Sequence, residues 1–318
     1  MDLARLARWL RCPTCGQDLQ PAPPLSLRCT HGHAIDANKR GYASLLAPST
    51  RVVGDSAPML SARARFLARG HFAPVVDALV DGLAAAGATA REDLSAAPRP
   101  ERRFLDAGCG TGYYLHQLLD RAIASNGLAA DLSPAAVSAA VRGRPDVDGV
   151  VADTWAGLPL RDGTADVVLD VFAPRNMGEF HRVLAPGGLV GVVTAGPDHL
   201  AELRAEGRAV GVQPDKRERI LESSAGLFDT ASETRVRREL LLSDEDVELL
   251  LGMGPSAHHQ AQPSVDDRSA PHGGSSSGSR ASATTRDTVE PGRPVTLDVM
   301  VYVLTRRDAS DTAHHVPA

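Results

Sequence analysis

The sequence predicts an α/β fold, a doubly wound sheet preceded by a small cysteine-bearing unit, from three observations. From Arg103 onward, short apolar segments alternate with segments of helical spacing, which is the pattern of β-α-β units. A glycine-rich loop at residues 106–112 joins the first of these strands to a helix. Three of the four cysteines lie within residues 12–29, too few and too clustered for a secreted disulfide framework.

Length and composition fit one large domain with a small appendage. The chain has 318 residues, of which 43% are hydrophobic, so it can bury a sizeable core. No apolar run approaches the roughly 18–20 residues of a membrane span, and residues 1–11 lack the long apolar core of a signal peptide. We therefore expect a cytoplasmic protein with no membrane partner.

The charge is unevenly distributed along the chain. Residues 1–70 carry ten Lys and Arg against four Asp and Glu, which gives +6, and since the total is −5 the remainder carries −11. A basic N-terminal portion on an acidic body favours a local anionic partner. The alternative is a solvated surface with a chance asymmetry.

The first hundred residues divide into two parts. Residues 12–33 show no apolar pattern of helical period, whereas residues 55–70 and 71–87 each have apolar side chains at helical spacing. Residues 88–102 are polar and contain proline, which is typical of a linker. We expect a cysteine-bearing domain over 1–50, a helical connector over 51–100 and the α/β domain over 101–307.

Within the α/β domain, Phe104 and Leu105 lead into the glycine loop, and Ser133 and Pro134 mark a helix start as N-cap and first-turn residue. The nearly continuous apolar run over 166–172 is typical of a buried parallel strand. The other predicted elements are helices over 113–124, 133–141 and 177–184, and strands over 127–131, 150–151 and 189–194.

The C-terminal part combines a low-complexity segment with a further strand. Residues 260–291 have almost no large apolar side chain, so we expect a disordered, flexible loop. A strand over 295–304 follows, so the loop interrupts the fold instead of ending it. Residues 308–318 are expected to form a frayed tail.

The glycine loop reads D-x-G-x-G-x-G, whereas dinucleotide enzymes have G-x-G-x-x-G. Asp131, after the next strand, is placed to accept hydrogen bonds from ribose hydroxyls. The loop, Asp153 and the turn Leu184-Ala185-Pro186-Gly187-Gly188 together resemble the motifs of class I S-adenosylmethionine (SAM)-dependent methyltransferases. The alternative is a structural turn without a ligand. The cofactor-binding residues that this resemblance implies are Asp106, Gly108, Gly110, Thr111, Gly112, Asp131 and Asp153.

The cysteines of the N-terminal unit have the spacing of a structural zinc site. Cys12 and Cys15 form a C-x-x-C knuckle, and Cys29 with His33 supplies the second pair of ligands. Three thiolates and one imidazole close the coordination shell, so the zinc would be structural. His31 competes for the fourth position, and we prefer His33 because the extra residue gives the chain room to turn back. Reduced, buried cysteines without a metal are the alternative.

A more specific resemblance comes from segments surrounding these motifs. They are Asn38–Leu46, Gly54-Asp55-Ser56, Gly70-His71-Phe72, Val171–Asn176, Gly196–Leu200 and Met253–Ser256. With the N-terminal Cys₃His unit they resemble the 23S rRNA (guanine-N1)-methyltransferases, especially the actinobacterial branch that confers resistance to tylosin-type and mycinamicin-type macrolides. The resemblance covers about residues 8–258 and 295–304.

The resemblance implies cofactors, partners and further site residues. It places zinc on Cys12, Cys15, Cys29 and His33, and it adds Phe72 and His199 to the SAM contacts. The family has Tyr at position 72 and often Trp at position 258, where this chain has Phe72 and His258. It also implies that the N-terminal domain recognises 23S rRNA, that the target is a hairpin-loop guanine near the peptide-exit tunnel, and that two subunits form a homodimer.

Guanine N1 carries a proton, so its methylation calls for a general base or for donors that stabilise the anion. The candidate bases are Asp55, Asp170 and Asp198. The sequence does not identify which of them is the catalytic residue, which is therefore unknown. Phosphate contacts are expected from Arg28, Lys39, Arg40, Arg51, Arg63 and Arg65.

Two other functions are considered. A small-molecule SAM methyltransferase is disfavoured by the zinc unit and the basic N-terminus, which a small substrate does not need. A non-catalytic zinc-bearing RNA-binding module is disfavoured by the intact glycine loop and Asp131.

Overall fold

The protein is described from a computed structural model. The described residues are 2–46, 50, 54–93, 101–121, 123–213, 215–254 and 292–308. The predicted loop over 260–291, the tail after residue 308, Arg51 and His258 lie outside them. No helix in the described part of the chain is long and apolar enough to cross a membrane.

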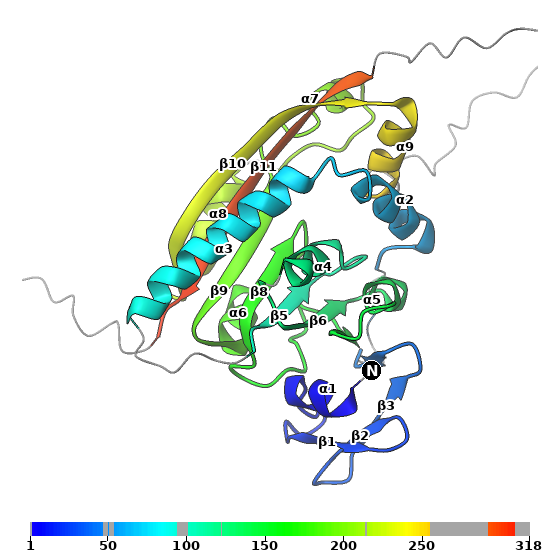
Figure 1. The fold of residues 1–318 in the computed structure, drawn as a ribbon, viewed down its shortest axis with the longest axis vertical. Coiled ribbons are helices and arrows are strands. Elements are labelled where there is room, and N and C mark those ends of the chain that lie inside the picture. The colour runs from blue at the N-terminus through cyan, green and yellow to red at the C-terminus, as the bar shows by residue number, and fades with distance from the viewer. Residues whose placement is uncertain are drawn as a thin grey trace, which may run out of the picture.

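The described strands form one sheet in the order β1-β2-β3-β4-β7-β6-β5-β8-β9-β11-β10 (Figure 1). In chain order they are β1 Leu19–Ala22, β2 Ser26–Cys29, β3 Ala34–Asn38, β4 Tyr42–Ser44, β5 Arg103–Ala107, β6 Asn126–Asp131, β7 Val147–Val151, β8 Ala165–Val171, β9 Leu184–Ala195, β10 Phe228–Leu242 and β11 Arg293–Arg306.

The central part of the sheet confirms the predicted fold class. Strands β7, β6, β5, β8 and β9 are parallel, and β11 runs antiparallel between β9 and β10. This is the doubly wound order, with one antiparallel strand inserted near its far end. It is the fold of class I SAM methyltransferases. The strand order reverses between β5 and β8, and in such sheets ligands bind at the carboxyl ends of the strands beside this point.

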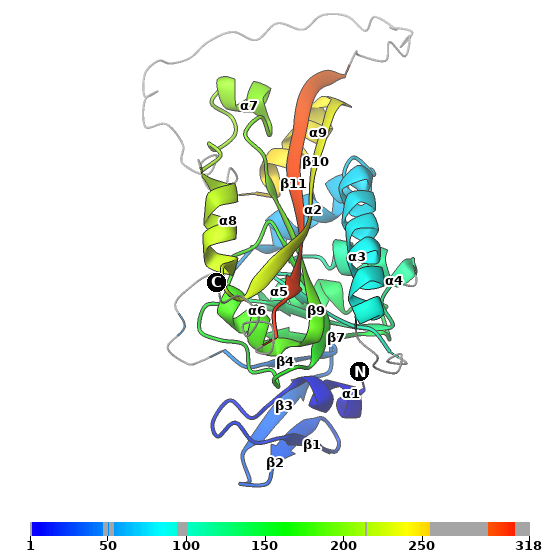
Figure 2. The ribbon, with the colours of Figure 1, turned by 90° about the vertical axis from the view of Figure 1, so that its left-hand side faces the viewer.

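Helices cover both faces of the sheet (Figure 2). Apolar side chains of α3, α4 and α5 form the core on one face, together with those of α2 and α9, and side chains of α1, α6 and α8 form the core on the other. The helices are α1 Leu3–Trp9, α2 Ala57–Leu67, α3 Ala73–Asp93, α4 Tyr113–Asp120, α5 Pro134–Ala140, α6 Met177–Val183, α7 Ala201–Ala205, α8 Lys216–Ser224 and α9 Asp244–Gly252.

The N-terminal unit continues the main sheet. Strand β4 pairs in parallel with β7, with Tyr42 opposite Gly149. Helix α1 packs Trp9, 1% exposed, into the same core as residues of β6 and β8. Nε of Arg5 lies 2.6 Å from the buried carboxylate of Asp148 on β7. Strand pairing, a shared core and an ion pair therefore join the unit to the α/β region; the division at residue 50 stays a prediction.

The structure also differs from the expected elements. Helix α3 continues through Asp93, so the polar segment predicted as a linker over 88–102 begins inside a helix. Residues 186–188, predicted as a turn before the strand, lie within β9, where Gly187 has φ 68° and the pairing with β8 is irregular. Strand β10 and helices α7, α8 and α9 were not predicted. Strand β10 is the edge strand of the sheet and is mostly exposed, so it lacks an apolar pattern.

Candidate cofactor cleft and metal centre

The four predicted zinc ligands converge in the N-terminal unit. One ligand atom from each of Cys12, Cys15, Cys29 and His33 lies within 4.8 Å of the others. Sγ of Cys15 is 3.7 Å from Sγ of Cys29, and Nδ1 of His33 is 3.6 Å from Sγ of Cys12 and 3.4 Å from Sγ of Cys29. Tetrahedral zinc separates two sulfur ligands by about 3.8 Å and a sulfur from a nitrogen by about 3.6 Å. The spacing therefore fits Zn²⁺.

Two tight turns bring these ligands together. The N–H of Gly16 donates to the carbonyl of Cys12 at 2.8 Å, and the N–H of Gly32 donates to the carbonyl of Cys29 at 3.0 Å. Both glycines have positive φ, which glycine adopts at little cost. His33 lies beyond the second turn and faces back toward Cys12, whereas His31 is exposed and outside the cluster. The geometry favours His33 over His31, and zinc binding by these four residues stays a prediction.

The glycine loop lies at the carboxyl end of β5. Gly108, Gly110 and Gly112 have φ of 86°, 51° and 77°, which L side chains rarely adopt. A Cβ at Gly108 would lie 2.5 Å from Cβ of Ala173, in the segment after β8. Glycine is therefore required both by the backbone and by close packing. Gly112 is the N-cap of α4. Because glycine has no side chain, it cannot cap the N–H groups in the first turn of this helix.

Asp131, at the end of β6, holds the glycine loop from the side. One carboxylate oxygen accepts from the N–H of Gly110 at 2.9 Å, and the other accepts from the N–H of Ser133 at 2.8 Å. A carboxylate has about four acceptor positions, so two remain for hydroxyl donors of a ligand. Burial raises the pKa of Asp131 above its ordinary value, while these two N–H groups oppose the shift.

Two further carboxylates lie buried under the loop. Asp106 and Asp170 stand at the carboxyl ends of the neighbouring strands β5 and β8, and both are almost fully buried. Burial raises the pKa of each to about 7; for Asp106 the charges of Asp131 and Asp170 add to the shift, and for Asp170 the cation of Arg175 opposes it. Oδ2 of Asp106 has no hydrogen-bond partner within the described residues. The site is therefore arranged to receive a cation.

An aromatic group lies at the carboxyl ends of β8 and β9. The ring of Phe172 is 6.1 Å from that of Phe72 and 6.3 Å from that of His199, to which it is nearly parallel. Nδ1 of His199 accepts from the N–H of Asp298 at 3.3 Å, so the proton of the neutral ring sits on Nε2. Burial lowers the pKa of His199 to about 4, so the ring is neutral near pH 7. Phe72 is 2% exposed and packs beneath Phe172.

Helices α2 and α9 pack together beside the glycine loop. Arg63 reaches from α2 over Gly110, where its Nη1 would lie 2.6 Å from an added Cβ. The same atom is 2.6 Å from Oδ2 of Asp55, and Nη2 donates to the carbonyl of Met253 at 2.8 Å. Arg65 pairs with Glu245 on α9. Of the expected phosphate contacts, Arg63 and Arg65 are thus engaged in internal ion pairs.

The three candidate bases differ in their surroundings. Asp55 is 29% exposed and paired with Arg63. Asp198 is 49% exposed and lies 3.0 Å from Nη2 of Arg235 on β10. Asp170 is completely buried, with Oδ2 at 2.5 Å from Nε of Arg175. Asp153 lies at the same sheet edge, after β7, where its carboxylate accepts from the N–H of Trp155 at 2.9 Å.

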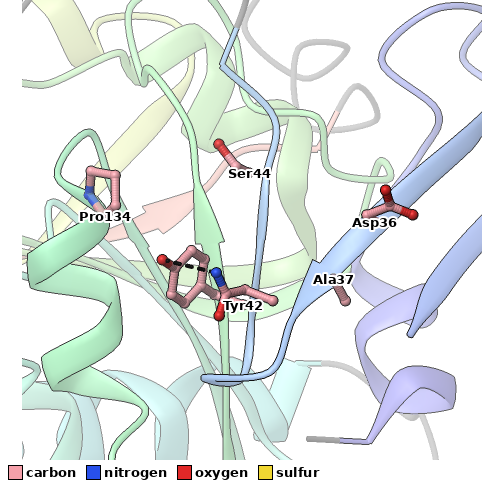
Figure 3. A pocket seen from close by; sticks show the side chains of 6 residues that line it. Asp36, Ala37, Tyr42, Ser44 and Pro134 are labelled. Atoms are coloured by element: carbon pink, nitrogen blue, oxygen red, sulfur yellow. Dashed lines mark hydrogen bonds between the residues drawn. The ribbon is translucent and has the colours of Figure 1, made fainter. Parts of the chain in front are cut away.

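A separate pocket opens where the N-terminal unit meets α5 (Figure 3). It has a volume of about 360 Å³ and lies between β3, β4 and the start of α5. The amide of Asn38 donates to the hydroxyl of Tyr42 at 3.4 Å within it. The lining residues are Asp36, Ala37, Asn38, Tyr42, Ser44 and Pro134. Exposed Lys39 and Arg40 follow Asn38 in the turn after β3, which gives this surface a positive rim.

Sequence reasoning missed several residues near the glycine loop. Phe172 and Trp155 are exposed aromatic side chains that come shortly after the buried strands β8 and β7, and this position in the sequence could have identified them. Lys216 begins α8 and is half-buried. Burial and then the charge of Arg175 lower its pKa. No sequence signal identifies Lys216, because it lies in a segment of low apolar content.

Comparisons with known proteins agree with this geometry. A family model described as a methyltransferase domain matches residues 104–188. The 23S rRNA (guanine(748)-N1)-methyltransferase of Streptomyces fradiae is 39% identical over 255 residues, which cover 80% of this chain and 88% of that protein. Proteins described as 23S rRNA (guanine-N1)-methyltransferases are 41% identical in Micromonospora griseorubida, covering 79% of this chain and 87% of that protein, and 33% identical in Bacillus subtilis, covering 61% and 67%. This chain therefore belongs to the family of 23S rRNA (guanine-N1)-methyltransferases.

Proposed function

We propose that this protein transfers a methyl group from SAM to N1 of a guanine in a 23S rRNA hairpin loop near the peptide-exit tunnel, with macrolide resistance as a consequence. The observation that carries the proposal is the glycine loop with its three carboxylates at the switch point of the sheet, in a chain that carries a Cys₃His centre. The relatives from Micromonospora griseorubida and Streptomyces fradiae match about four fifths of this chain. Because the proposed substrate is ribosomal RNA, we expect the protein to act in the cytoplasm.

Two observations support SAM binding at the glycine loop. Asp131 keeps acceptor positions for the ribose hydroxyls, and the buried Oδ2 of Asp106 has no partner among the described residues, where the ammonium group of SAM would supply one. When bound, SAM supplies an electrophilic methyl group. The residues proposed to hold it are Phe72, Asp106, Gly108, Gly110, Thr111, Gly112, Asp131, Asp153 and His199.

The N-terminal unit supplies the proposed RNA contact. Arg28, Lys39 and Arg40 are exposed on its strands and turns. Such cations bind phosphate without reading sequence. The metal holds the two turns of the unit in place, so we assign zinc a structural role in presenting these cations. A homodimer that grips the RNA with two such units remains part of the proposal.

Methylation also requires a residue that removes the N1 proton of guanine. Each of the three candidates is paired with an arginine: Asp55 and Asp198 are partly accessible, whereas Asp170 is completely buried, and burial raises its pKa to about 7. Lys216, whose charge helps to lower the pKa of His199, would stabilise the negative charge that the base acquires on O6. Replacing Asp55, Asp170 and Asp198 by Asn one at a time, and comparing the pH–rate profiles, identifies the proton acceptor as the residue whose loss removes the acidic limb.

The function is tested with labelled SAM and unmodified 23S rRNA, followed by primer extension. Methylation at N1 blocks base pairing, so we expect a stop at a single guanine. The control is an Asp131→Asn variant, which weakens the hold on the glycine loop and should reduce the stop. Label that enters only small molecules, or RNA binding without transfer, would contradict the proposal.

A further inference from the structure

Phe172 has an unusual backbone conformation for its residue type. It follows β8, the central strand at the switch point, and has φ 52°. A bulky side chain in this region is strained, and such strain persists where the surrounding structure enforces it, often at functional sites. Its N–H donates to the carbonyl of Val193 on β9 at 3.0 Å, which fixes the backbone. The fixed backbone conformation therefore determines the direction in which the side chain of Phe172 leaves the chain.

That direction leaves the ring open to solvent. Phe172 is 45% exposed, although it directly follows a strand in which every residue except Asp166 is buried. Phe72 supports it from one side, at 6.1 Å and an interplanar angle of 68°, and Phe72 in turn packs on Phe66 at 5.7 Å. An aromatic ring that packs against a buried ring on one side and is exposed to solvent on another is suited to stacking with a planar ligand.

The ring also stands beside the methyl-donor cleft. Ala173, the next residue, touches the glycine loop so closely that Gly108 has no space for a Cβ. His199, which we propose to contact SAM, lies nearly parallel to Phe172 at 6.3 Å. Lys216 acts electrostatically on His199, and within the described residues it has no acidic partner. A planar group stacked on Phe172 would thus lie next to the glycine loop and to His199, on which the charge of Lys216 acts.

We propose that Phe172 is the platform on which the target guanine stacks during methylation. This inference rests on the proposed function. A base that reacts at N1 must leave its pairing and stacking partners, and aromatic side chains commonly receive such splayed bases. The exposed Trp155 lies on the loop after β7, where its N–H is tied to Asp153; its backbone shows no comparable strain.

Three replacements of Phe172 test the platform. Phe172→Leu keeps apolar bulk but removes the aromatic face, and Phe172→Tyr keeps the face. Phe172→Gly removes the ring and suits the positive φ, so it should fold even if other variants do not. The control is Leu241→Ala, which removes another exposed apolar side chain, on the edge strand β10.

The measurements separate base stacking from donor binding. We expect Phe172→Leu and Phe172→Gly to slow single-turnover methylation of 23S rRNA roughly 5- to 150-fold, the effect of losing one base–aromatic stack. The Kd for SAM should change less than about twofold, and Phe172→Tyr and Leu241→Ala should retain the wild-type rate. With 2-aminopurine at the mapped guanine, emission should stay quenched in the wild-type complex and rise with Phe172→Gly.

Each contrary result has a distinct meaning. An unchanged rate with Phe172→Leu, with unchanged emission, overturns the platform while leaving the methyltransferase function in place. A loss of rate matched by an equal loss of SAM affinity also overturns it, because the ring would then pack the donor. A wild-type protein that modifies no guanine contradicts the proposed function itself, and with it the platform.

Discussion

At the scale of single residues, two histidines separated by one position have different surroundings. His33 lies beyond the Gly32 turn with Nδ1 directed at Cys12 and Cys29, whereas His31 stands in the exposed part of the turn. A structural zinc ligand contributes directly to folding, because the metal binds the folded unit. His33→Ala should therefore lose zinc and lower the thermal midpoint, and His31→Ala should keep one zinc per chain. Metal analysis with thermal unfolding checks this; equal zinc loss in both variants would contradict the ligand set.

The buried Asp106 predicts an unusual pH dependence of stability. Burial, followed by the charges of Asp131 and Asp170, raises its pKa to about 7 from 3.8. Between these values the folded state holds a proton that the unfolded state has lost, so the contribution of Asp106 to stability is full below about pH 4 and is lost as the pH rises through 7. Asp106→Asn removes this dependence.

We therefore expect apo Asp106→Asn to lose less stability than wild type between pH 5.5 and pH 8.5, values that bracket the folded pKa of about 7. The slope should be reduced and not abolished, because the pKa of Asp170 is also raised to about 7. Urea unfolding of the SAM-free protein at both pH values measures the difference. Parallel stability curves for the two proteins would show that Asp106 does not titrate in this range.

Residue types and spacings predicted the Cys₃His cluster and the glycine loop, because both motifs are local and their chemistry demands particular side chains. The conformation of Phe172 could not be predicted. Its positive φ depends on the hydrogen bond to Val193, on the neighbouring strand, and on packing against Phe72, about a hundred residues earlier in the chain. The half-buried position of Lys216 depends in the same way on contacts made only after folding.

At the scale of elements, helix α1 is fastened to the sheet by one buried ion pair. Arg5 lies against Asp148, whose side chain is completely buried. Removing one partner of such a pair leaves a buried charge without compensation and costs about 3–5 kcal/mol. Arg5→Ala should thus be strongly destabilising. Arg11→Ala is the matched control on the same unit, because its pair with Asp162 is exposed and contributes about 0–1 kcal/mol.

Chemical denaturation of the two variants measures this difference. The stability of Arg5→Ala should recover partly at low pH, where protonation of Asp148 removes the unpaired charge; its pKa is already raised by burial. Similar small losses in both variants would mean that the ion pair does not hold α1 in place.

The elements with strong apolar patterns were predicted within a few residues. Strand β8 was expected over 166–172 and spans Ala165–Val171, and the helix after Ser133 begins as expected at Pro134. Strand β10 was missed because an edge strand with one neighbour needs no alternating apolar pattern. The strands of the N-terminal unit are short, and β4 pairs with β7 from a distant part of the chain, which leaves no periodic signal in the sequence.

At the scale of the whole molecule, exposed cations lie at both ends of the sheet. The N-terminal unit forms one end of the strand order, and β10 forms the other. Exposed Lys39 and Arg40 lie at the first end, and exposed Arg238 lies at the second. If RNA is held by the N-terminal unit, the same change of charge should have different effects at these two places.

Arg40→Ala should weaken binding of 23S rRNA and reduce the slope of log K against log salt by about 0.7–0.9, the effect of losing one phosphate contact. Arg238→Ala should leave both the affinity and the slope unchanged, although it removes the same charge. SAM affinity should be unaffected in either variant, because neither side chain contacts the glycine loop. A filter-binding titration over several salt concentrations makes the comparison. Equal slopes for the two variants would place the RNA contact elsewhere, since the zinc-bearing end of the sheet would then have no greater role than the opposite edge.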